Sequence, residues 1–150
     1  MDPGLADGGG NAELLNTLLG AEHQMVAAYT AGMPLLDGAA LINAQHILEQ
    51  EHEHIERLRA LISGAGANPV GPLGSYDFNT PANQAEMLRE LMRVERQGIA
   101  IYGELVPRIP DPQLRMLAAS IATAEAEHDS LLLARLGRWP APTAFVTGRS

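Results

Sequence analysis

Cysteine is absent from this 150-residue sequence, and basic residues are few, with ten against 18 acidic ones. Without cysteine the chain has no disulfide, no thiol nucleophile and no cysteine-based zinc or iron–sulfur site. A net charge of −8 with scattered basic residues argues against nucleic acids and anionic membranes as partners, because both bind clustered positive charge. No apolar run is long enough to cross a bilayer. The absence of cysteine leaves the redox compartment undecided.

Length and hydrophobic content predict one folded domain. A chain of 150 residues that is 46% hydrophobic can bury a single core of ordinary size, so a second domain is not needed. Residues 1–11 carry acids and glycines where a secretory signal has a basic patch and an apolar run. We therefore expect a cytoplasmic protein, and the alternative is an exported precursor that was trimmed.

A set of two glutamates and one histidine occurs twice, the second time 73 or 74 residues after the first. The residues are Glu22, Glu51 and His54 in the first set and Glu95, Glu125 and His128 in the second. Each histidine follows its nearer glutamate by three positions, so on a helix the two side chains project from one face and can bind the same ion. The four carboxylates together supply the negative charge that balances two divalent cations. The pattern predicts a di-metal site.

The repeat extends to apolar positions around these six residues. With an offset of 73, Leu15, Leu18, Leu19, Val26, Tyr29 and Met33 match Leu88, Leu91, Met92, Ile99, Tyr102 and Val106. With an offset of 74, Ala44, Ile47, Leu58 and Ile62 match Ala118, Ile121, Leu132 and Leu136. Since every pair is similar in type, we interpret the chain as a duplicated helical hairpin.

Apolar periodicity and turn residues predict four helices, over about 12–35, 39–63, 81–106 and 111–137. Residues 1–11 are expected to form a flexible arm, and the Pro-rich residues 138–150 a tail that is not a long helix. The Gly- and Pro-rich segment 64–81 is long for a loop, and its length lets the third helix begin at the far end of the bundle. The prediction is an all-α four-helix bundle, residues 12–137, made of two duplicated hairpins joined by a long crossover.

The acids and histidines of the repeat are predicted to face the core. At about 100° per residue, Glu51 and His54 fall within the apolar stripe of their helix, whereas Glu49 and His52 project from the opposite side. The matching pair on the fourth helix also falls within the apolar stripe. Buried carboxylates and imidazoles cost free energy unless something satisfies them. A metal pair is the simplest compensation, and mutual hydrogen bonding with proton sharing, without metal, is the alternative.

Two tyrosines are candidates for supporting the metal ligands. Tyr29 and Tyr102 each lie seven residues, or two helical turns, after Glu22 and Glu95 on the same face. This position suits a phenol that hydrogen-bonds a ligand carboxylate from the opposing hairpin. The alternative is plain packing in the core.

The remaining histidines carry weaker signals. His23 neighbours a ligand but lies on another face, so we expect it at the surface or behind the ligands. His46 has no partner in the sequence and is expected in solvent. His52 projects outward, where a haem ligand at a dimer interface is the alternative to a solvated helix face.

In these motifs the sequence resembles the ferritin-like superfamily, with a symmetric site of the rubrerythrin and bacterioferritin type. Within it, the chain is similar to the bacterial ferritin-like domains grouped with desiccation-related proteins, from residue 13 to about 136. The resemblance implies that the six residues of the repeat bind two metal ions. It also implies that Glu51 and Glu125 bridge or chelate, while Glu22 and Glu95 are terminal ligands.

The chain departs from these relatives in two respects. Rubrerythrins carry a Cys-rich rubredoxin module that feeds electrons to the site, so a chain without cysteine is expected to need an external reductant. Storage cages usually have a short fifth helix where this chain has a Pro-rich tail. A homodimer is therefore a more natural expectation than a cage.

The ligand set itself predicts redox chemistry. Carboxylates with one imidazole per ion suit two Fe ions, two Mn ions or a mixed Fe/Mn pair, and the absence of thiolates argues against structural zinc. Such a pair can deliver two electrons to O2 or H2O2. The leading hypothesis is an oxidoreductase of the ferroxidase, peroxidase or catalase type. The alternatives are a stress- or desiccation-associated structural protein that metals stabilise, and a simple helical interaction module.

Overall fold

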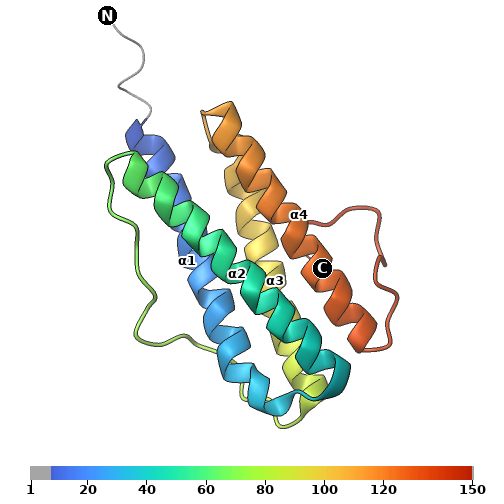
Figure 1. Ribbon diagram of the computed structural model, residues 1–150. Coiled ribbons are helices and arrows are strands. Elements are labelled where there is room, and N and C mark those ends of the chain that lie inside the picture. The colour runs from blue at the N-terminus through green and yellow to red at the C-terminus, as the bar shows by residue number, and fades with distance from the viewer. Residues whose placement is uncertain (1–7, 150) are drawn as a thin grey trace, which may run out of the picture.

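The computed structural model describes residues 8–149, which contain four long helices and no strand (Figure 1). Helix α1 spans Gly8–Gly32, α2 spans Gly38–Gly64, α3 spans Gln84–Leu105 and α4 spans Pro112–Arg135. Two short 3₁₀ turns, η1 at Met33–Leu35 and η2 at Val106–Arg108, follow α1 and α3. The predicted all-α fold is confirmed. Within 8–149 no helix is both long enough and apolar enough to traverse a bilayer.

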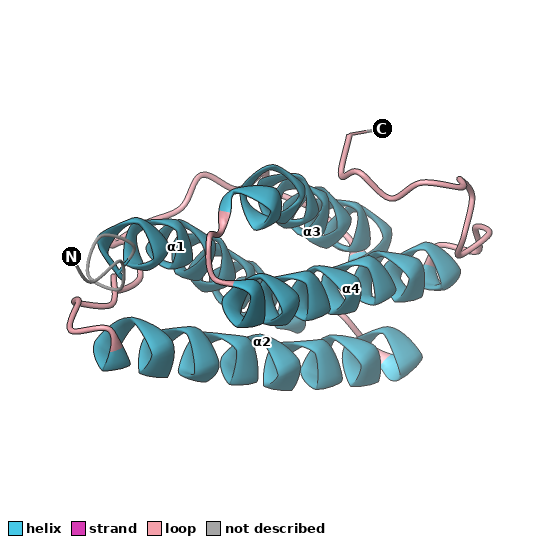
Figure 2. Ribbon diagram, turned by 90° about the horizontal axis from the view of Figure 1, so that it is seen from above, coloured by secondary structure: helices cyan, strands magenta, loops and turns pink. Residues whose placement is uncertain are grey.

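The four helices form two antiparallel hairpins, α1 with α2 and α3 with α4. Helix α1 also packs against α3, and α2 against α4, so the helices enclose one interior (Figure 2). The crossover, residues 65–83, runs along the outside of the bundle from the end of α2 to the opposite end (Figure 1). Helix α3 therefore starts where α2 started, as the length of the crossover predicted.

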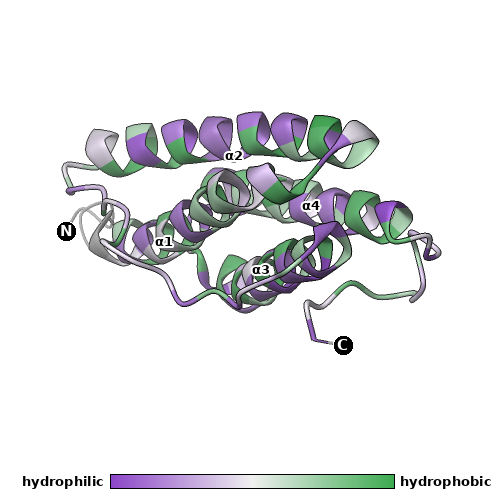
Figure 3. Cartoon of the chain, turned by 90° about the horizontal axis from the view of Figure 1, so that it is seen from below, coloured by the Kyte–Doolittle hydropathy of each residue, from purple (hydrophilic) through white to green (hydrophobic). Residues whose placement is uncertain are grey.

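The core consists of two apolar clusters that lie on either side of the predicted metal ligands. One cluster contains Met25, Tyr29, Ile47, Leu91 and Leu132, and the other contains Leu18, Leu58, Ile62, Tyr102 and Ile121. On each helix the acidic or histidine positions fall between residues of the two clusters. Hydrophilic residues of α2 lie on its outward side (Figure 3). The polar layer therefore lies between two layers of apolar packing, which keep bulk water from reaching it through either end of the bundle.

Two predicted helix starts are wrong by a few residues. Helix α1 begins at Gly8 rather than Ala12, because Asn11 and Ala12 are already buried in the bundle and this packing outweighs the low helix propensity of the glycines. Residues 8–11 are thus part of the helix and not of a flexible arm, while residues 1–7 of that arm lie outside the described residues. Helix α3 begins at Gln84, after the cap Asn83, whose side chain accepts a hydrogen bond from the Glu86 N–H.

The crossover is fastened to α1 by side-chain hydrogen bonds. Asn16 donates to the Asn68 carbonyl at 3.0 Å and accepts from the Val70 N–H at 2.8 Å. His23 Nε2 lies 3.1 Å from the Val70 carbonyl oxygen, to which it donates, and only 6% of the residue is exposed. His23 is therefore neither a surface residue nor a neighbour that supports the ligands, because the crossover covers it.

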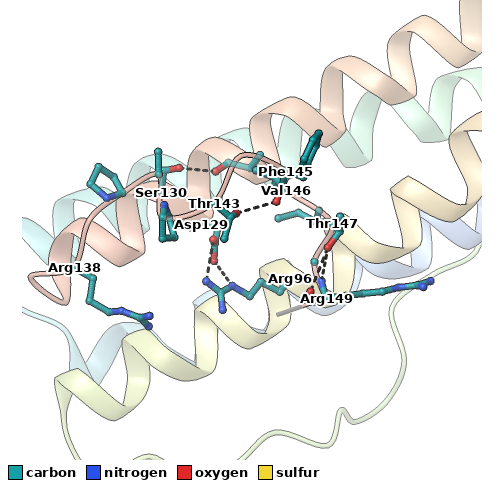
Figure 4. A pocket seen from close by; sticks show the side chains of 15 residues that line it. Arg96, Asp129, Ser130, Arg138, Thr143, Phe145, Val146, Thr147 and Arg149 are labelled. Atoms are coloured by element: carbon teal, nitrogen blue, oxygen red, sulfur yellow. Dashed lines mark hydrogen bonds and ion pairs between the residues drawn. The ribbon is translucent and has the colours of Figure 1, made fainter.

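The C-terminal tail repeats this arrangement on the second hairpin. Residues 138–149 contain no helix, as predicted, and they turn back along the bundle (Figure 1). They cover a pocket of about 500 Å³ (Figure 4). In this pocket Arg96 of α3 makes a bidentate ion pair with Asp129 of α4, with Nε 2.9 Å from Oδ1 and Nη2 3.3 Å from Oδ2. Each hairpin is followed by an extended segment that lies over its own first helix, and the residues covered there, His23 and Arg96, match at the offset of 73.

Replacing Glu90 with alanine should destabilise the protein by about 2 kcal/mol, because its buried carboxylate holds both the end of the crossover and a cation. Glu90 accepts from the backbone and side chain of Asn79, at 3.0 and 2.7 Å, and from Arg93. Urea unfolding measures the loss, and Glu104→Ala, an exposed position of the same helix, is the matched control. Equal stabilities of the two variants would contradict the role of Glu90.

Candidate metal centre

The six residues of the repeat meet in the middle of the bundle, one or two from each helix. Glu22 comes from α1, Glu51 and His54 from α2, Glu95 from α3, and Glu125 and His128 from α4. The four glutamates are fully buried and His128 is 1% exposed, whereas the His54 side chain is 14% exposed. The helical periodicity explains this convergence, since each residue lies in the apolar stripe of its helix.

The ligand atoms divide into two groups that share two carboxylates. One group contains Glu22, Glu51, His54 and Glu125, and the other contains Glu51, Glu95, Glu125 and His128. Within each group the ligand atoms lie within 4.8 Å of one another. Glu51 and Glu125 belong to both groups, so they lie between the two groups. This geometry agrees with the bridging role that the family resemblance implies for them.

Each histidine turns Nδ1 toward three carboxylates. Nδ1 of His54 lies 3.1 Å from Glu125, 3.2 Å from Glu22 and 3.4 Å from Glu51. Nδ1 of His128 lies 3.0 Å from Glu51, 3.3 Å from Glu125 and 3.6 Å from Glu95. The two imidazole rings are stacked, with centroids 6.3 Å apart. Nδ1 is thus the candidate ligand atom in both rings, that of His54 in one group and that of His128 in the other.

Several of these atoms lack hydrogen-bond partners, and this is the observation that tests the fit of a metal. Both carboxylate oxygens of Glu51 and of Glu125, Oε2 of Glu95 and Nδ1 of His128 are buried without a hydrogen bond. An unsatisfied buried polar atom costs about 1–3 kcal/mol. Carboxylate oxygens and imidazole nitrogens are the donors that Fe(II) and Mn(II) prefer. The residues therefore fit a pair of divalent ions.

In the metal-free chain the histidines carry the compensating charge. Burial alone would lower the pKa of His54, but the carboxylates of Glu125, Glu22 and Glu51 outweigh burial and raise this pKa to about 12. The pKa of His128 also rises to about 12, since its three carboxylate neighbours outweigh its burial. Both imidazoles are therefore protonated at neutral pH when no metal is bound.

The glutamates respond to burial and to these two cations in different ways. Burial raises the pKa of Glu22 and of Glu95 well above the ordinary value. For Glu125, the adjacent imidazoles of His128 and His54, 3.3 and 3.1 Å away, overcome burial and hold the pKa at about 2. In the metal-free chain, bound protons thus offset the buried negative charge, which corresponds to the proton sharing that the sequence left open as the alternative to metal. A metal ion must displace these protons to bind.

The two tyrosines join the hairpins at the terminal carboxylates. The Tyr29 hydroxyl donates to Oε1 of Glu95, and the Tyr102 hydroxyl donates to Oε1 of Glu22. Each bond crosses from one hairpin to the other, as the seven-residue spacing predicted. Burial and the nearby carboxylates raise the pKa of both phenols well above 10, so they remain donors. Each donor holds Oε1 of its carboxylate; Oε2 of Glu22 lies 3.2 Å from Nδ1 of His54, and Oε2 of Glu95 is buried without a hydrogen bond.

One supporting residue was missed in the sequence. Gln50 of α2 accepts a hydrogen bond from Nε2 of His128 at 2.7 Å, through its Oε1. Gln50 precedes Glu51 and falls at the edge of the apolar stripe, where periodicity alone predicts nothing. Its contact depends on how α2 and α4 are aligned, which a single sequence does not show. His46 and His52 are exposed, as expected.

The fold is shared with two solved structures that are each 20% identical to the chain. A conserved hypothetical protein from Mycobacterium tuberculosis matches with a TM-score of 0.82 over 93% of this chain and 99% of its own. A structure described as ferritin-like, diiron-carboxylate proteins from Bacillus anthracis matches with a TM-score of 0.73 over 87% of this chain and 98% of its own. None of the curated proteins compared with the chain matches it.

The ferritin-like domain family matches residues 10–138, which include all four helices almost completely and every residue of the candidate metal centre. This agrees with the family that the paired Glu-x-x-His motifs indicated. The chain belongs to the ferritin-like domain family.

Proposed function

We propose that this protein is a di-metal carboxylate oxidoreductase that acts on Fe(II) with O2, or on H2O2, with two Fe ions, two Mn ions or one of each per chain. The observation that carries the proposal is the pair of ligand groups that share Glu51 and Glu125, with inward oxygens that lack hydrogen bonds. Six ligand residues for two ions leave coordination positions for a small molecule. When bound, such a pair supplies one electron per ion to O2 or H2O2.

Different residues of the chain would bind the ions, support the ligands and limit access to the site. Glu51 and Glu125 would hold both ions, Glu22 with His54 would complete one position, and Glu95 with His128 would complete the other. The two tyrosines keep the terminal carboxylates in place through hydrogen bonds. The apolar clusters above and below limit access to small molecules such as O2 and H2O2. A sequence without cysteine offers no thiol as an electron donor, so the reductant would be external.

Anaerobic titration with Fe(II), followed by addition of O2 or H2O2, tests the proposal. We expect saturation near two ions per chain and oxidation of Fe(II) well above the background of free iron. Glu127→Ala, an exposed position next to the ligands on α4, should behave as the unaltered protein. Saturation at zero would contradict the metal centre, and binding without oxidation would favour the structural alternative.

The same samples address storage and assembly. Residues 138–149 contain no fifth helix, so we expect a dimer or another small oligomer, with no ferric mineral beyond the bound pair. Light scattering with the ratio of oxidised iron to protein measures both properties. A hollow assembly that holds hundreds of irons per particle would contradict this part of the proposal.

A further inference from the structure

The two ion positions differ just outside the ligand set. The offset of 74 that places Glu51 on Glu125 and His54 on His128 also places Gln50 on Ala124. The duplicated halves therefore agree at the ligands and disagree at the residue before the first of them. This position faces the histidine of the opposite hairpin, as the contact between Gln50 and His128 shows.

On the His128 side, Gln50 fixes the orientation of the imidazole and decides which nitrogen keeps its proton when an ion displaces the other one. A neutral imidazole has one N–H and one lone pair, and only the lone pair can bind a metal. The hydrogen bond to Oε1 of Gln50 places the N–H on Nε2, which leaves the lone pair on Nδ1 facing the carboxylates. The Gln50 amide nitrogen lies 3.3 Å from Nε2 of His46, so the amide is held at both ends.

On the His54 side no such partner exists. Ala124 has no polar side-chain atom, and among residues 8–149 no hydrogen bond reaches Nε2 of His54. A pocket of about 390 Å³ opens there, lined by His54, Arg57, Leu117, Ala124 and three further residues. The His54 side chain is 14% exposed, compared with 1% for His128. The pocket thus brings solvent to the outer edge of the His54 imidazole, whereas the His128 imidazole is closed off.

We propose that the two ion positions are inequivalent, with Gln50 making the His128 position tight and slowly exchanging. The small residue Ala124 leaves the His54 position weaker and open, so this is where ions enter and leave. The inference rests on the proposed metal binding but not on the proposed redox reaction. Gln50 acts as a positioning residue, since it touches a ligand and not an ion.

Anaerobic titration with Co(II), which reports its own coordination by absorption, tests the inference without turnover. We expect two binding steps and, after addition of a chelator, two release rates. Gln50→Ala should weaken the tight step by about 10–100-fold, the range for partners of metal ligands. Ala124→Gln should strengthen the weak step and slow the faster release. Gln45→Ala, an exposed position of the same helix, is the matched control.

Variants of the ligands show which ion position gives each of the two Co(II) binding steps. Glu22→Gln should remove the weak step and Glu95→Gln the tight one, since each carboxylate belongs to one group only. A gain of affinity in Ala124→Gln cannot come from misfolding, so it protects the test against a damaged Gln50 variant. One common affinity and release rate, or an unchanged step in either the Gln50 or the Ala124 variant, would overturn the inference. Absence of any Co(II) binding would overturn the proposed metal centre as well, which separates the two failures.

Discussion

Replacing Glu125 with alanine should weaken metal binding at both positions by more than about 100-fold, whereas replacing Glu95 should affect one position only. Glu125 belongs to both ligand groups and Glu95 to one, so the number of lost ions follows from the geometry. The lower bound comes from partners that merely touch a ligand, whose loss already costs about 10–100-fold. Elemental analysis after dialysis against a weak chelator gives the stoichiometry.

Controls for this prediction lie on the same helices. Glu127→Ala keeps the net charge of the Glu125 variant but changes an exposed side chain, so it should retain both ions. Glu51→Ala should resemble the Glu125 variant, because Glu51 is the other shared carboxylate. If Glu125→Ala and Glu95→Ala lost the same number of ions, the assignment of shared and terminal carboxylates would be wrong.

Raising the pH from about 6.5 to 8.5 should destabilise the metal-free protein and stabilise the metal-loaded one. His54 and His128 have a pKa of about 12 in the folded metal-free chain, against 6.5 in the unfolded chain. Their contribution to folding is complete below pH 6.5 and is lost as the pH rises toward 12. The slope is at most about 1.4 kcal/mol per pH unit for each histidine. The raised pKa values of Glu22 and Glu95 act in the same direction.

Metal reverses the slope because it binds the deprotonated ligands. Its affinity therefore rises with pH, and so does the stabilisation that it gives to the folded state. Urea unfolding at several pH values, with a chelator and then with Mn(II), measures the two slopes. The control variant His52→Ala, at an exposed position of α2, should show the same two slopes as the unaltered protein. A metal-free protein whose stability stays flat or increases over this range would contradict the protonated state of the two histidines.

The sequence predicts the helices and the convergence of the six candidate ligands well, because both follow from periodicity along one chain. Glu51 and His54 lie three residues apart within an apolar stripe, and that spacing alone places them on one face. Because the second hairpin repeats the first, its two glutamates and one histidine occupy the matching core-facing positions and meet the first set in the interior. The long crossover follows from the length of the segment between α2 and α3, since a short link would make those helices antiparallel neighbours.

The features that the sequence did not predict depend on contacts between segments. The start of α1 at Gly8 requires the burial of Asn11, and a run of three glycines gives no local sign of it. The burial of His23 requires the crossover to pass over α1, which is a property of the assembled bundle. The contact of Gln50 with His128 requires the alignment of α2 with α4. Local patterns specify elements, whereas partners across the bundle come from packing.

The sharing of each ion position between hairpins has a consequence for how such a chain could arise. A lone hairpin carries two glutamates and one histidine on an apolar face, and either ligand group needs at least one carboxylate from the other hairpin. An ancestral single hairpin could therefore build this centre only as a twofold pair, and symmetry would copy every residue and make the two ions identical. Fusion of the two copies into one gene removes that constraint. Glutamine at 50 and alanine at 124 are the kind of divergence that only the fused chain permits.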